Sequence, residues 1–215
     1  MGELILSGGG GATQTLEMNR YFVSRLQEVT SVLYIPLAGD EDYRTYECCY
    51  EYTCSLFPDT QVTMWTDLSE KTYEDMTSFS GVYMSGGSVT KLLSELVKTG
   101  FDLLLKKFFA DGGIIYGQSA GAIVLGETVK HYEKSEPKIG SLKNLDGLKL
   151  LGAYTVWCHY TAKDEGVVKR YSNEYELPIL TIPDGTAVVV NQKSMLQIGE
   201  IPPHVIFKDE KKSIL

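Results

Sequence analysis

The chain has 215 residues, of which 43% are hydrophobic and 22% charged, a composition typical of one folded domain. Its formal net charge is −8, from 28 acidic and 20 basic residues. That sign repels phosphate backbones and anionic lipids, and no apolar run reaches the roughly 18 residues that a membrane span needs. We therefore expect neither a nucleic-acid partner nor a membrane partner.

The first residues and the cysteines indicate a reducing compartment. Glu3 stands where a secretion signal would carry basic residues, and the apolar stretch that follows it is short. Adjacent Cys48 and Cys49 fit neither a common disulfide pattern nor a zinc-ligand spacing. We expect a cytoplasmic protein with reduced thiols, among them Cys158 as a buried apolar side chain.

Short apolar runs alternate with amphipathic ones along the chain. We predict strands at 3–7, 31–36, 61–65, 81–84, 113–116, 150–157, 179–182, 186–190, 195–198 and 205–207. We predict helices at 14–29, 43–57, 89–111 with a break at Gly100, 120–125 and 162–176. The alternation is typical of an α/β fold with a mostly parallel sheet covered by helices on both faces.

The closely spaced strands after residue 178 predict an antiparallel C-terminal extension at one edge of that sheet. Residues 133–146 form the longest predicted loop. Without a repeat or a Pro- and Ser-rich linker, residues 1–215 are interpreted as a single domain.

The segment Gly117-Gln118-Ser119-Ala120-Gly121 has the pattern G-x-S-x-G between an apolar strand and a predicted helix. This context predicts a nucleophile elbow, a tight turn that projects the serine hydroxyl from the sheet. Small flanking residues avoid clashes there, and the backbone N–H of Ala120 and the helix N-terminus face an oxyanion that forms on the substrate. The same pattern also fits a simple turn where a helix packs closely on a sheet.

A serine hydroxyl needs a general base, and the chain has three histidines, at positions 131, 159 and 204. His159 is favoured because it follows a predicted strand that can end near the elbow. A carboxylate must orient the imidazole. Spacing alone does not choose among the candidates Glu127, Glu133, Glu136, Asp164 and Asp184.

Two glycine-rich turns also follow predicted strands. Ser85–Ser88 precedes a helix, where Gly86 and Gly87 would let the backbone approach a substrate and donate an oxyanion N–H, although a plain turn explains it as well. The run Gly8–Gly11 fails the dinucleotide pattern G-x-G-x-x-G, so we interpret it as close backbone packing beside the site.

Together these segments resemble the peptidase E family of serine peptidases, which includes α-aspartyl dipeptidases and cyanophycinases. The resemblance spans most of the chain, including 35–39, 85–87, 117–122 and His159. It implies a three-layer, flavodoxin-like α/β sandwich that hydrolyses a small peptide as a dipeptidase or exopeptidase, with N-terminal Asp-Xaa as a candidate substrate. It implies no metal or organic cofactor, and we expect a monomer or a homodimer.

By the same resemblance, Ser119 is the nucleophile, His159 the general base, and Gly87 and Ala120 the oxyanion-hole donors. The family's acidic residue lies in the loop after the elbow helix, where Glu133 is our choice and Glu136 the second. Substrate binding falls on Gly86 and on a basic residue after His159, for which we choose Arg170 over Lys163 and Lys169.

Two other functions remain open from the sequence. One is an α/β-hydrolase esterase with Ser119, Asp184 and His204 in chain order. The other is a non-catalytic protein that binds a small ligand and retains the elbow as a packing feature.

Overall fold

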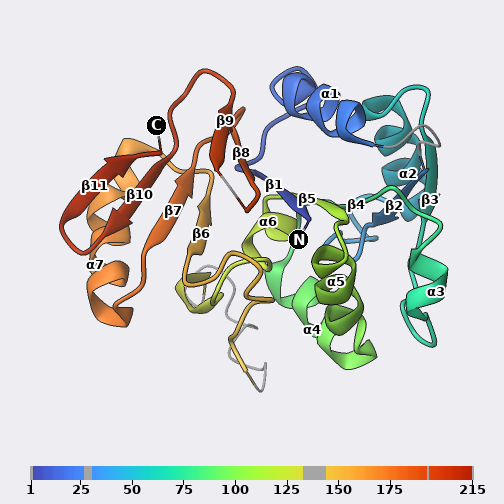
Figure 1. Cartoon of the computed structure of the whole chain (residues 1–215). Coiled ribbons are helices and arrows are strands. Elements are labelled where there is room, and N and C mark those ends of the chain that lie inside the picture. The colour runs from blue at the N-terminus through green and yellow to red at the C-terminus, as the bar shows by residue number, and fades with distance from the viewer. Residues whose placement is uncertain (1, 27–30, 133–143, 193, 215) are drawn as a thin grey trace.

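The computed structural model describes residues 2–26, 31–132, 144–192 and 194–214, and within them a seven-stranded sheet forms the centre of the molecule (Figure 1). Its strands, in spatial order, are β3 (Gln61–Met64), β2 (Ser31–Ile35), β4 (Gly81–Met84), β5 (Ile114–Gln118), β1 (Glu3–Ser7), β8 (Ala187–Val190) and β9 (Met195–Ile198). Neighbouring strands from β3 to β1 pair in parallel. Strand β8 pairs antiparallel with β1, and β9 pairs antiparallel with β8. The carboxyl ends of the parallel strands therefore meet at one edge.

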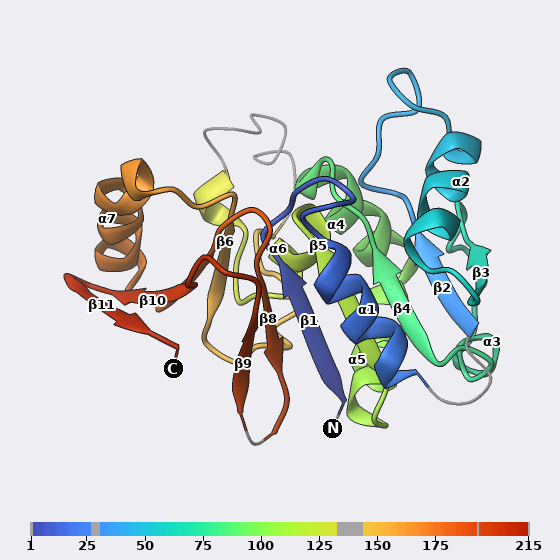
Figure 2. The same ribbon diagram turned by 90° about the horizontal axis from the view of Figure 1, so that it is seen from above.

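Side chains of the central strands alternate between two hydrophobic cores. Leu4 and Leu6 of β1 belong to one core and Ile5 to the other, as the twofold period of a strand requires. Figures 1 and 2 show the helices on both faces. One face carries α1 (Leu16–Arg25) and α2 (Tyr46–Leu56); the other carries α3 (Tyr73–Met76), α4 (Val89–Thr99), α5 (Phe101–Ala110) and α6 (Ala120–Ile123).

A second sheet lies beside the first (Figure 1). In the described part of the chain it has four strands, in the order β11 (Glu210–Ser213), β10 (His204–Phe207), β7 (Ile179–Ile182) and β6 (Thr155–Cys158). Strands β6 and β7 are parallel, and α7 (Glu165–Tyr175) covers one face through Val168 and Tyr171. The other face adds Val156, Leu180 and Ile182 to the core beneath α6.

The predicted α/β class, mostly parallel sheet and antiparallel C-terminal strands are confirmed. The prediction of one edge extension is wrong for β7 and β10, which pair in the second sheet, whereas β8 and β9 extend the first. The strand pattern gives each segment's period but not its pairing partner. The sequence also missed α3 and β11, and it predicted a longer helix than the single turn of α6.

No helix formed by the described residues has both the length and the apolar character needed to cross a membrane.

Candidate active site

Ser119 lies in a sharp turn between β5 and α6. Its φ of 51° and ψ of −111° are unusual for a residue with a side chain. The backbone N–H of Ser119 donates to the carbonyl of Ser7 at the end of neighbouring β1, at 2.9 Å. A Cβ on Gly117 would clash with the backbone of Gly121, and a Cβ on Gly121 with the carbonyl of Met84. The two glycines of G-x-S-x-G therefore allow the close strand-to-helix packing that exposes the serine.

His159 follows β6 and brings its ring to this serine. Its Nε2 lies 2.7 Å from Ser119 Oγ. Like Ser119, His159 has a positive φ, 56°. Its backbone N–H donates to the carbonyl of Gly8 at 3.1 Å, which fixes the end of β6 beside the end of β1.

Asp184 supplies the carboxylate on the other side of the ring. Its Oδ1 lies 2.6 Å from His159 Nδ1. Cys158 pairs with Ile182 in the parallel strands β6 and β7, so the residues that follow leave the same edge of the second sheet. Because a carboxylate accepts, Nδ1 carries the proton and Nε2 is free to accept from the serine hydroxyl.

The glycine run after β1 lies between the two sheets and links them by backbone hydrogen bonds. The N–H of Gly8 donates to the carbonyl of Thr186, and the carbonyl of Gly9 accepts from the N–H of Gly185 at 3.0 Å. Gly9 has a φ of 122°, and a Cβ there would lie 2.8 Å from Asp184 Oδ1 and press into the ring of His159. The predicted close packing beside the site is thus packing against the imidazole and its carboxylate.

The turn after β4 lies against Ser119. A Cβ on Gly86 would be 3.2 Å from Cβ of Ser119, and one on Gly87, with a φ of 140°, would collide with the carbonyl of Ala38. The N–H of Ser88 donates to that carbonyl at 2.7 Å. The Ser85–Ser88 turn is therefore held beside the serine, where backbone N–H groups can face a bound carbonyl.

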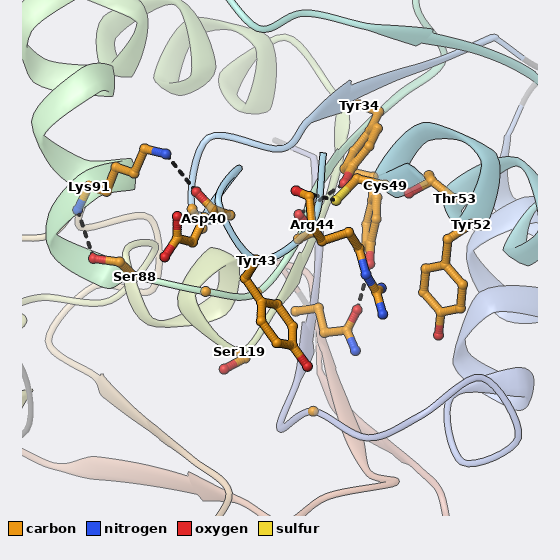
Figure 3. Close-up of a pocket in the computed structure, with 18 of the residues that line it drawn as sticks. Tyr34, Asp40, Tyr43, Arg44, Cys49, Tyr52, Thr53, Ser88, Lys91 and Ser119 are labelled. Carbon is orange, nitrogen blue, oxygen red and sulfur yellow. Dashed lines mark hydrogen bonds between the residues drawn. The ribbon is translucent and has the colours of Figure 1, made fainter. Parts of the chain in front are cut away.

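These groups open into a cavity of about 1320 Å³ (Figure 3). Its walls come from the elbow, His159, the Ser85–Ser88 turn, the loop 38–44 after β2, and helices α2 and α4. Figure 3 shows the loop residues Asp40, Tyr43 and Arg44 on this cavity with Ser119. The cavity has room for a short peptide beside the serine.

Comparison with known proteins places the chain in a peptidase family. Residues 4–198 match the model of peptidase family S51. The chain belongs to peptidase family S51. Membership classes it with the serine-type peptidases and confirms the expected resemblance to peptidase E.

Two relatives of this chain are named as uncharacterized peptidases. One, from Pasteurella multocida, is 29% identical over 125 residues, which are 55% of this chain and 59% of the relative. Another, from Listeria monocytogenes, is 27% identical over 119 residues, 54% of this chain and 58% of the relative. The match thus spans less than two thirds of the length of these relatives.

Two solved structures share the fold of this chain. A protein assigned to peptidase E from Listeria monocytogenes has a TM-score of 0.72 at 21% identity, over 94% of this chain and 100% of that one. A peptidase from an acI-B1 actinobacterium has a TM-score of 0.72 at 16% identity, over 99% of this chain and 93% of that one. At these identities the likeness establishes the fold alone.

The structure of this chain brings together most of the residues predicted for the site. Ser119, His159, Gly86 and Gly87 line one cavity, and Ala120 follows Ser119 at the start of α6. Glu133 and Glu136 lie outside the described residues. The carboxylate in contact with the imidazole is that of Asp184, which the sequence offered as one of five candidates.

The structure corrects two other predictions. Arg170 is exposed on α7 and does not line the cavity, where the basic residues are Arg44 and Lys91. His204 lies in β10, between β7 and β11, and Asp184 contacts His159 instead. The esterase arrangement of Ser119, Asp184 and His204 is therefore not formed: His159 follows β6 and contacts Asp184, whereas His204 begins β10.

His131 and Cys158 are buried near β6 and do not line the cavity. His131 is buried, its Nε2 lies 2.8 Å from the carbonyl of Val156, and burial lowers its pKa to about 4. Cys158 is 2% exposed, as predicted. Among the described residues no group of three or more His, Cys, Asp or Glu side chains has an arrangement that could hold a metal ion.

Proposed function

We propose that the chain hydrolyses short peptides through an acyl-enzyme on Ser119, with His159 as general base and Asp184 as the third member of the triad. The observation that carries the proposal is the continuous chain of contacts, 2.7 Å from Ser119 Oγ to His159 Nε2 and 2.6 Å from His159 Nδ1 to Asp184 Oδ1. Both distances are within hydrogen-bond range for nucleophile activation.

The reaction follows from these contacts. Ser119 Oγ attacks the carbonyl carbon of the scissile bond while His159 Nε2 takes the hydroxyl proton. Asp184 stabilises the imidazolium that forms. His159 then gives the proton to the leaving amine, the C–N bond breaks and an ester to Ser119 remains. A water molecule, deprotonated by the same imidazole, hydrolyses that ester and restores the serine.

The tetrahedral intermediates carry a negative oxygen, and we propose the backbone N–H groups of Gly87 and Ala120 as its donors. Ala120 directly follows the nucleophile, and the turn containing Gly87 packs against Ser119. Loss of one such donor typically costs about 3–4 kcal/mol of transition-state stabilisation. Because α6 is a single turn, this proposal assigns the stabilisation to the two N–H groups rather than to a helix dipole.

For substrate choice we propose Arg44 as the residue that attracts a carboxylate of the peptide. Two basic residues line the cavity, and Lys91 Nζ already donates to the carbonyl of Gly39 at 2.6 Å. The guanidinium of Arg44 lies over the ring of Tyr52, 5.7 Å from its centroid, and the described residues give it no carboxylate partner (Figure 3). An unpaired guanidinium in a cavity favours a bound carboxylate.

Replacement of the nucleophile tests the reaction. Ser119→Ala should lower kcat on dipeptides by about 10⁴-fold or more and abolish covalent labelling by a fluorophosphonate, because the attacking oxygen is lost. The measurement is a screen of dipeptides and tripeptides with varied N-terminal residues, alongside mass spectrometry of the labelled protein. A Ser119→Ala protein that still turns over peptide would contradict the proposal, and so would a wild type that resists labelling, as expected of a binding protein.

Replacement of the cavity arginine tests the substrate choice. Arg44→Gln should lower kcat/KM for Asp-Xaa dipeptides by about 10- to 100-fold, since a charge-assisted hydrogen bond is lost, and should change kcat/KM for Ala-Xaa far less. Arg170→Gln is the matched control and should affect neither. Equal effects of Arg44→Gln on both substrates would show that the guanidinium does not select a side-chain carboxylate.

A further inference from the structure

Both polar atoms of the Gln118 side chain, which precedes the proposed nucleophile, form hydrogen bonds. Gln118 is the last residue of β5, is part-buried and lines the cavity. Its Oε1 accepts a hydrogen bond from the hydroxyl of Tyr83 in β4, at 2.5 Å, and its Nε2 donates to the carbonyl of Gly10, at 3.1 Å. One side chain thus ties two strands to the glycine run after β1.

The chemistry of the partners fixes which way the amide points. The carbonyl of Gly10 can only accept, so it requires the NH₂ of the amide. Burial raises the pKa of Tyr83 well above its ordinary value, so its hydroxyl keeps a proton to donate. A flipped amide would place oxygen against oxygen at Gly10 and lose that hydrogen bond, although the Tyr83 hydroxyl could still accept from the NH₂.

The segment that Gln118 holds is the one that supports the imidazole. Gly10 follows Gly8 and Gly9 in the run. The carbonyl of Gly8 accepts from the backbone N–H of His159, and Gly9 packs against the ring of His159. The side chains of His159 and Asp184 are themselves about half exposed, 52% and 49%. Their position therefore depends on backbone neighbours more than on enclosure by side chains.

We infer that Gln118 is a positioning residue for the proposed reaction: it holds the glycine run against the elbow so that His159 Nε2 stays within hydrogen-bond distance of Ser119 Oγ. It acts through the backbone of the run rather than on the substrate. This inference rests on the proposed serine mechanism. Reacting groups must be held to within about 0.5 Å, and a misplacement of about 1 Å can cost on the order of 100-fold in rate.

Two substitutions separate the roles of the amide. Gln118→Met keeps the length of the side chain and removes both hydrogen bonds, whereas Gln118→Glu keeps the acceptor for Tyr83 and removes the donor to Gly10. Gln197→Met is the matched control. Gln197 lies on β9, and its Nε2 also donates to a glycine carbonyl, that of Gly199, at 2.7 Å.

The measurements are kcat and KM on a cleaved dipeptide, the rate of fluorophosphonate labelling, thermal unfolding, and the proton NMR signal of His159 Nδ1–H. We expect both Gln118 variants to lower kcat and the labelling rate by about 10- to 100-fold, to leave KM within about threefold, and to shift or broaden the imidazole signal. Gln197→Met should match the wild type in all four.

The outcomes distinguish the two proposals. If the wild type neither reacts with the fluorophosphonate nor cleaves the dipeptides, the serine mechanism is contradicted, and this inference with it. If the wild type reacts, an unchanged kcat in both Gln118 variants overturns the positioning role. A raised KM with unchanged kcat also overturns it, because that result would assign Gln118 to substrate binding. If Gln118→Met unfolds, the more conservative Gln118→Glu decides.

Discussion

At the scale of single residues, the site depends on two backbone conformations that side chains rarely adopt. Ser119 and His159 both have positive φ values, 51° and 56°. Such conformations cost about 1–3 kcal/mol each and persist where neighbours hold them. Here the N–H groups of both residues donate to consecutive carbonyls, those of Ser7 and Gly8. The strain aims the hydroxyl and the imidazole at each other.

The carboxylate on His159 Nδ1 gives a prediction at this scale. Asp184→Asn should lower kcat by about 10³- to 10⁴-fold, because an amide no longer stabilises the imidazolium and can hold the ring in the wrong tautomer. Steady-state kinetics on a cleaved dipeptide measure the loss, and KM should change little.

Glu133→Gln is the comparison for Asp184→Asn, since the family resemblance alone favours that glutamate. We expect its kcat to stay within about threefold of the wild type, because the imidazole already has its carboxylate at 2.6 Å. The reverse ranking of the two variants would assign the third triad position to Glu133.

At the scale of elements, the segment between β1 and α1 joins the two sheets. Its backbone bonds to the ends of β6 and β8, through His159 and Thr186, and to Gly185 in the turn after β7. Because its glycines have no Cβ, this backbone approaches the imidazole and the carboxylate directly. The glycine run, which the sequence predicted to pack closely beside the site, thus serves as a spacer between the ends of strands.

Gly9→Ala tests that role. The new methyl group would press on His159 and lie 2.8 Å from Asp184 Oδ1, so we expect kcat to fall by about 100-fold or more. Gly112→Ala is the matched control: its φ of 104° is similarly unfavourable for alanine, and nothing lies within 4 Å of the added Cβ. Both should lose some stability in urea unfolding, and only Gly9→Ala should lose its activity. Equal kcat in the two variants would contradict the spacer role.

At the scale of the whole molecule, the site lies where two sheets meet. Ser119 follows a strand of the large sheet, whereas His159 and Asp184 follow two strands of the small one. A common core beneath α6 holds the sheets together, with Ile115 from the first and Val156 and Leu180 from the second. The contact between Ser119 and His159 therefore depends on the packing between the two sheets.

His131 packs against β6 of the second sheet and makes stability depend on pH. It is fully buried at 5% exposure, stacks on Trp157 and bonds to the carbonyl of Val156. Its pKa falls from 6.5 to about 4 on burial. Between these values the unfolded chain binds a proton that the folded chain does not, so the free energy of unfolding decreases as pH falls from 6.5 to 4, by about 3 kcal/mol from this residue.

His131→Gln should remove that component, because glutamine can still donate to Val156 and does not titrate. Urea unfolding at pH 7.5 and at pH 4.5 measures the difference for each protein. We expect a smaller loss on acidification in the variant than in the wild type, since the carboxylates contribute equally to both. Identical losses would show that His131 is not the buried neutral histidine described here.

The sequence by itself determined the features that depend on neighbouring residues. The period of apolar residues predicted most strands and helices, and the small residues around Ser119 predicted the elbow, since both are set by local sterics. The position of His159 after a strand was similarly local information. The structure then gave these residues the contacts that their chemistry requires.

Only the tertiary structure decided which residues meet across the sheets. Asp184 is 25 residues from His159, and their contact follows from the pairing of β6 with β7. Arg44 reaches the cavity, and Arg170 does not, because of how the loop after β2 and helix α7 lie. A strand's pattern of side chains states which face is buried but not which strand lies beside it, because pairing depends on chain segments far apart in the sequence.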